Sequence, residues 1–90
     1  MRNDMNTDTF NIMHKMFHNV DLRRVWFEIL KTRTGRPERL SKDISLPVCA
    51  VRIEIEELRN LGLVKKEGST YYISAKGVLF SQDTKGMILQ

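Results

Sequence analysis

The sequence predicts an α+β fold that is mainly helical. Apolar residues recur every three or four positions over most of residues 7–61, which is typical of helices with one buried face. From residue 63 the spacing shortens to that of strands, around a turn that contains Gly68. The chain has 90 residues, so we expect one domain spanning 1–90.

The first helix is expected over residues 7–18, with residues 1–6 frayed before it. Thr7 or Asp8 can cap its start, because a short polar side chain accepts a hydrogen bond from a free backbone N–H. Its apolar residues are Phe10, Ile12, Met13, Met16 and Phe17. This set is wider than one stripe, which predicts contact with two surfaces.

Two further helices are expected before residue 45. Asn19 or Asp21 can start one that runs to about Lys31. Its predicted core face comprises Leu22, Val25, Trp26, Ile29 and Leu30. Residues 32–36 end it, with Gly35 expected in a left-handed turn. Pro37 suits the first turn of a short helix over 37–43, which would bury Leu40 and Ile44.

A fourth helix is predicted over residues 46–61, with Ser45 as its N-cap and Pro47 in its first turn. Its buried face comprises Val48, Val51, Ile55, Leu58 and Leu61. Gly62 can end it in a left-handed cap.

A hairpin follows, with strands at 63–66 and 71–74 around the turn at 67–70. Ser74 can cap a last helix within 75–90, whose extent stays open because Gly77 and Gly86 weaken helices.

The charge of the chain favours an anionic partner, nucleic acid first. The net charge is +4, and the isoelectric point is about 9.5. Five cations fall within twelve residues: Lys31, Arg33, Arg36, Arg39 and Lys42. Lys65 and Lys66 add two more in the hairpin. A solvated basic face would explain the same pattern.

A short helix, a tight turn and a longer helix form the layout that places a recognition helix in the major groove. Residues 55–64, Ile-Glu-Glu-Leu-Arg-Asn-Leu-Gly-Leu-Val, resemble the end of the recognition helix in winged helix-turn-helix repressors of the arsenic-repressor and multiple-antibiotic-resistance types. Residues 71–77 resemble the returning wing strand and the helix start after it, and residues 21–30 resemble the helix before the motif. The resemblance covers about residues 20–80.

This resemblance implies a winged helix with its core over 20–74 and with additional N- and C-terminal helices. It implies a transcription regulator that binds double-stranded DNA, with the recognition helix 46–61 in the major groove and the wing 64–74 on the backbone. The expected base-reading residues are Val48, Cys49, Ala50, Arg52, Ile53 and Glu56. The expected phosphate contacts are Arg33, Arg36, Arg39, Lys42, Lys65, Lys66, Ser69, Thr70 and Tyr71.

The predicted recognition helix departs from the pattern of these repressors. Val48, Cys49, Ala50 and Ile53 stand where polar residues are usual, and residues 48–59 hold two arginines against three glutamates. This composition favours an alternative, a winged helix that binds a protein within a larger complex. A third hypothesis is an architectural protein that binds DNA without regard to sequence.

We also expect a homodimer, because the apolar area of the first helix and of the C-terminal segment exceeds what one core uses. Its expected interface comprises Phe10, Met13, Met16, Phe17, Met87, Ile88 and Leu89.

Other classes of function find little support. The sequence has no glycine-rich phosphate loop and no nucleophile beside a base, so we expect neither an enzyme nor a cofactor or small-molecule ligand. His14 and His18 lie four apart but lack a nearby acid or thiol, so we expect no metal site. No apolar run approaches membrane-spanning length. Cys49 is the single cysteine, which favours the reducing cytoplasm.

Overall fold

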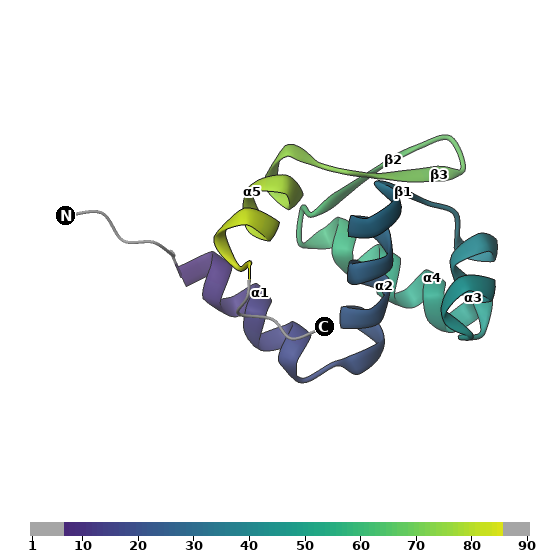
Figure 1. Ribbon diagram of the computed structural model, residues 1–90, viewed down its shortest axis with the longest axis horizontal. Helices are drawn as coiled ribbons and strands as arrows, with labels where there is room; N and C mark the ends of the chain where they lie inside the picture. Colours follow the sequence, from purple (N-terminus) through teal and green to yellow (C-terminus); the bar gives the residue numbers. More distant parts are fainter. Residues whose placement is uncertain (1–6, 86–90) are drawn as a thin grey trace.

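The computed structural model describes residues 7–85, which form an α+β fold dominated by helices (Figure 1). The helices are α1 (Thr7–Phe17), α2 (Val20–Thr32), α3 (Pro37–Ile44), α4 (Val48–Asn60) and α5 (Ala75–Asp83). The strands are β1 (Thr34–Gly35), β2 (Val64–Glu67) and β3 (Thr70–Ile73). The predicted fold class, mainly helical α+β, is therefore confirmed.

The three strands form one antiparallel sheet in the order β1-β3-β2. Val64 pairs with Ile73 and Glu67 with Thr70 across the predicted hairpin. Thr34 pairs with Tyr72 on the other side of β3. The sequence analysis did not predict β1, because two residues are too short to show the alternation of a strand.

The core lies around α2, which is the central helix in Figure 1. Its residues Leu22, Val25, Trp26 and Ile29 are buried, as their spacing predicts. Val51, Ile55 and Leu58 of α4 join the same core. The ring of Trp26 meets Phe80 of α5 edge-on, with 5.8 Å between ring centroids, so the last helix also closes this core.

Three predicted helix ends are confirmed. The Asn19 side chain accepts a hydrogen bond from the Leu22 N–H at 3.0 Å and caps α2. Gly62 follows the end of α4 with φ +84°, a left-handed conformation that costs glycine little. The Ser74 side chain accepts from the Gly77 N–H at 2.9 Å and caps α5.

Two turn predictions were wrong. Arg33, not Gly35, takes the left-handed conformation after α2, with φ 70° and its N–H donating to the Ile29 carbonyl. Gly35 lies buried in β1, where an added Cβ would meet Leu40 Cδ1 at 2.9 Å. Ser45 ends α3 with φ 58° and does not cap α4. Helix α4 begins at Val48, because Pro47 disfavours helical geometry at the residue before it.

The expected dimer residues separate into three groups. Met13 and Met16 are buried in this chain's own core, so that part of the prediction was wrong: their side of α1 already packs against the domain. Phe10 and Phe17 are exposed. Met87, Ile88 and Leu89 lie outside the described residues, as do residues 1–6.

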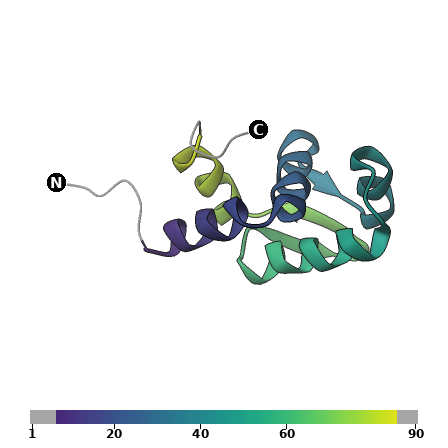
Figure 2. The same cartoon turned by 90° about the horizontal axis from the view of Figure 1, so that it is seen from below.

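Figure 2 shows α4 along one side of the molecule, with α2 and α3 on its inner side. The outer side of α4 is therefore open. Over residues 7–85, no helix has both the length and the apolar character needed to cross a lipid bilayer.

Candidate nucleic-acid interface

The outer face of α4 is a line of small or apolar side chains. Cys49, Ile53 and Asn60 are exposed and lie opposite the buried residues Val51 and Ile55. Ile53 is 66% exposed. Val48 and Ala50, also expected to read bases, are half-buried. The structure therefore brings Cys49, Arg52 and Ile53 furthest into solvent among the expected base-reading residues.

The three glutamates of α4 each have a partner within the chain. Glu54 accepts a hydrogen bond from Asn19 Nδ2 at 3.2 Å. Glu57 pairs with Lys15 Nζ of α1 at 3.5 Å. Glu56 accepts a hydrogen bond from the Tyr71 hydroxyl and pairs with Arg59 at 3.3 Å. Glu56, which is expected to read a base, thus has its carboxylate engaged with the hairpin and with Arg59.

These contacts shift the protonation of α4's carboxylates. The Tyr71 hydroxyl, by donating to Glu56, lowers the pKa of that carboxyl below its usual range. Burial, and then the hydrogen bond to Glu56, raise the pKa of Tyr71. Burial raises the pKa of Glu54, and the hydrogen bond from Asn19 opposes part of this shift. Glu56 therefore stays ionised to lower pH than Glu54.

Tyr71 also departs from its predicted role as a phosphate contact. The residue is only 4% exposed and forms part of the core. Lys66 Nζ lies 5.6 Å from the centroid of its ring, on the solvent side. Tyr71 therefore connects the hairpin to α4. Lys66, whose Nζ lies near the Tyr71 ring, is the residue that is exposed to solvent there.

A shallow groove separates α3 from β1 and the tip of the hairpin. It is lined by Thr32, Thr34, Gly35, Arg36, Glu38, Arg39, Leu40, Lys42, Asp43 and Thr70. Arg36 Nε donates to Thr70 Oγ1 at 3.2 Å, which joins the start of α3 to the hairpin. Arg36, Arg39, Lys42 and Thr70, four of the expected phosphate contacts, therefore lie together.

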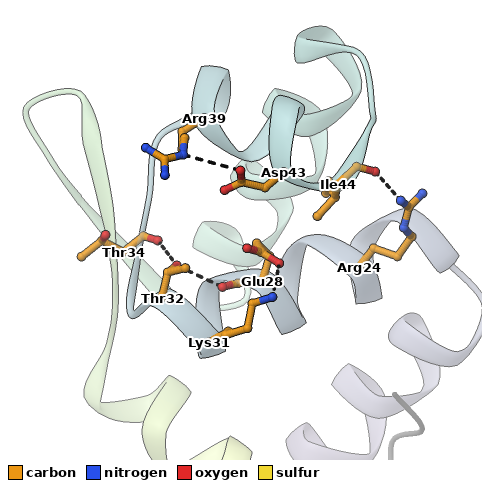
Figure 3. Close-up of polar contacts among 8 residues, drawn as sticks. All are labelled: Arg24, Glu28, Lys31, Thr32, Thr34, Arg39, Asp43 and Ile44. Atoms are coloured by element: carbon orange, nitrogen blue, oxygen red, sulfur yellow. Dashed lines mark hydrogen bonds and ion pairs between the residues drawn. The ribbon is translucent and has the colours of Figure 1, made fainter.

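Hydrogen bonds to α2 position this groove, as Figure 3 shows. Arg24 donates to the carbonyl of Ile44 and holds the end of α3. Thr32 Oγ1 donates to the Glu28 carbonyl at 3.0 Å and to the Thr34 carbonyl at 2.6 Å, so the end of α2 is tied to β1.

We call six exposed cations the basic strip: two that flank β1, two in α3 and two in the hairpin. They are Arg33, Arg36, Arg39, Lys42, Lys65 and Lys66. Arg39 pairs with Asp43 at 3.5 Å, drawn in Figure 3, and Lys65 pairs with Glu67 at 3.8 Å. Within residues 7–85, the other four form no ion pair with a carboxylate. Ser69 is exposed beside them at the hairpin tip.

Arg52 lies between the basic strip and the outer face of α4. Its Nη2 is 2.5 Å from Glu38 Oε2 of α3, and both side chains are exposed. An exposed ion pair of this kind contributes little to stability, so the guanidinium can exchange Glu38 for another partner. The sequence analysis did not predict this ion pair, because Glu38 and Arg52 are fourteen residues apart and lie on different helices.

The remaining candidate groups do not form a site. His14 and His18 are exposed, with ring centroids 4.4 Å apart. Within the part of the chain that the structure describes, no three His, Cys, Asp or Glu residues are placed to hold a metal ion. Cys49 is an exposed free thiol.

Comparisons of the chain with family models, with curated proteins and with solved structures find no match. Three features of the molecule bear on its function: the open face of α4, the basic strip, and the hydrogen bond that joins α3 to the hairpin.

Proposed function

We propose that this chain is a winged helix-turn-helix domain that binds double-stranded DNA and regulates transcription. The order of elements supports this proposal: α2, then the short α3, a tight turn, the longer α4, and the hairpin of β2 and β3. In this layout α4 enters the major groove, and the hairpin lies along the phosphate backbone.

The basic strip is the observation that carries the proposal. The Arg36–Thr70 hydrogen bond makes its parts on α3 and on the hairpin neighbours. The Arg52–Glu38 ion pair and the Tyr71–Glu56 hydrogen bond join those two elements to α4. A row of cations beside an exposed helix suits a duplex, because the phosphates flank a groove that admits the helix. The acidic composition of α4 opposes this less than its sequence suggests, since each of its glutamates has a partner in the chain.

Titration of labelled duplexes at several salt concentrations tests the proposal. Replacing one cation that contacts phosphate should weaken binding to all sequences about equally and lower the slope of log K against log salt by roughly one. We expect this for Arg36→Ala and for Lys42→Ala. Lys85→Ala is the matched control, because Lys85 is an exposed cation outside the basic strip.

Two outcomes separate the alternatives. A folded protein that binds no duplex at low salt would favour the protein-binding module, for which the exposed Ile53 is the supporting observation. Equal affinity for random and selected duplexes would favour an architectural DNA-binding protein. Equal salt slopes for Arg36→Ala, Lys42→Ala and Lys85→Ala would exclude the backbone role of the strip.

A further inference from the structure

Ile53 is the most exposed of the large hydrophobic residues that the structure describes, at 66%. It lies near the middle of α4, one turn after Cys49 and two turns before Asn60. An isoleucine at such a position gains nothing from the core and has a lower helix propensity than Ala or Leu. Its exposed apolar surface is therefore available to a partner.

The surroundings of Ile53 are cationic on one side, and each of the three glutamates of α4 has a partner within the chain. Arg52 precedes it, and the basic strip lies beyond Arg52 along α3 and the hairpin. On the other flank, Glu54 and Glu57 are held by Asn19 and Lys15. A complementary partner thus presents negative charge toward α3 and the hairpin, and an apolar group opposite Ile53.

The size of the exposed apolar patch at Ile53 indicates whether its partner is a protein or a nucleic acid. The neighbours of Ile53 one turn earlier on α4 are the small residues Cys49 and Ala50, and those one turn later are Glu56 and Glu57. The other exposed large hydrophobics belong to α1, α2 and α5. A protein interface has a wider apolar centre with aromatic or long side chains. A single exposed apolar side chain beside cations is instead suited to one methyl group in a DNA groove that is flanked by phosphates.

We propose that Ile53 recognises the C5 methyl group of a thymine in the major groove. This inference depends on the proposed function and specifies its ligand as duplex DNA with thymine at a defined position. The thymine methyl is the apolar group that bases present on the floor of the major groove, and phosphates line both of its edges. Arg52 is then placed to contact a neighbouring base or phosphate once it leaves Glu38.

Deoxyuridine tests this inference directly, because it pairs as thymine does and lacks only the methyl group. A tightly bound duplex is first selected from a random pool, and each thymine is then replaced singly by deoxyuridine. We expect the wild-type protein to lose about fourfold in affinity at one or two positions per site, the amount that burial of one methyl group supplies.

The variant Ile53→Ala should bind the all-thymine duplex about fourfold more weakly and should be insensitive to deoxyuridine at those positions. Leu79→Ala is the matched control, because Leu79 is 59% exposed but lies on α5. It should keep the full deoxyuridine effect. Circular dichroism establishes that each variant is folded.

The outcomes distinguish this inference from the proposed function. Tight binding that tolerates deoxyuridine everywhere overturns the role of Ile53 and leaves DNA binding intact. A deoxyuridine effect that persists in Ile53→Ala assigns the methyl contact to another side chain and also overturns it. If the folded wild-type protein binds no duplex at all, the proposed function itself fails.

Discussion

Glu56 and Tyr71 form the contact that ties the hairpin to α4. Tyr71 is buried and donates its hydroxyl hydrogen to Glu56, which Arg59 also contacts. A phenol whose hydroxyl lies at the edge of a core requires such an acceptor, because an unpaired polar group there is costly. This pair fixes where the returning strand lies relative to the outer face of α4.

Tyr71→Phe should show how this contact depends on pH. The Tyr71 hydroxyl lowers the folded-state pKa of Glu56 below its ordinary value of 4.5. The stability that this hydrogen bond gives the folded protein is therefore fully present above pH 4.5, and it is lost as the pH falls through the folded-state pKa. We expect the variant to raise the Glu56 pKa, measured by NMR. Its loss of unfolding free energy should be larger at pH 7 than at pH 3, as urea denaturation can measure. Equal losses of unfolding free energy at pH 7 and pH 3 would show that the Tyr71 hydroxyl does not stabilise the ionised form of Glu56.

Among the elements, α5 depends on an unusually close approach to the chain segment before β2. A Cβ added at Gly77 would lie 2.2 Å from the carbonyl oxygen of Leu63 and 2.9 Å from Ile73 Cγ1. The Ser74 N–H donates to the same Leu63 carbonyl at 3.0 Å. Gly77, which weakens a helix by propensity, is therefore what allows α5 to dock.

Gly77→Ala should destabilise the domain although alanine favours helix. Overpacking against a backbone atom typically costs about 1–3 kcal/mol, which exceeds the gain in helix propensity of roughly 1 kcal/mol. Gln82→Ala, on the exposed side of the same helix, should change the unfolding free energy by no more than about 0.5 kcal/mol. Urea denaturation compares the two. A stabilised Gly77→Ala would mean that α5 can move away from Leu63 at little cost.

At the scale of the whole molecule, the outer face of α1 exposes two phenylalanines with His14 between them. Phe10 and Phe17 are two turns apart on one face and are 56% and 47% exposed. An antiparallel two-fold pairing of α1 would bring Phe10 of each copy against Phe17 of the other, a self-complementary arrangement. Two copies would present two α4 helices to half-sites about 10 bp apart.

We predict a homodimer that depends on this face. The wild-type protein should sediment at twice the chain mass of 10.5 kDa, and the double variant Phe10→Ser, Phe17→Ser at the chain mass. Ile53→Ser, which removes an exposed apolar side chain elsewhere, should remain a dimer. Wild-type protein that stays at the chain mass at tens of micromolar would show that α1 serves only its own domain.

Local structure is the part of the fold that could be predicted from the sequence. Helix spacing, the caps at Asn19 and Ser74 and the left-handed Gly62 were all predictable, because each involves interactions within about one turn of chain. The hairpin was predictable for the same reason, since its alternation and its turn lie within ten residues, 64–73.

Tertiary packing alone decided which side chains remain free at the candidate site. Arg36 meets Thr70 across 34 residues of sequence, and Glu54 meets Asn19 across 35. Such partners depend on how whole elements pack, which no local pattern encodes. The sequence therefore gives the types of charged residues near the candidate site, but only the packed structure shows that Tyr71 and Met16 are buried, that α4's glutamates are engaged, and that Ile53 faces solvent.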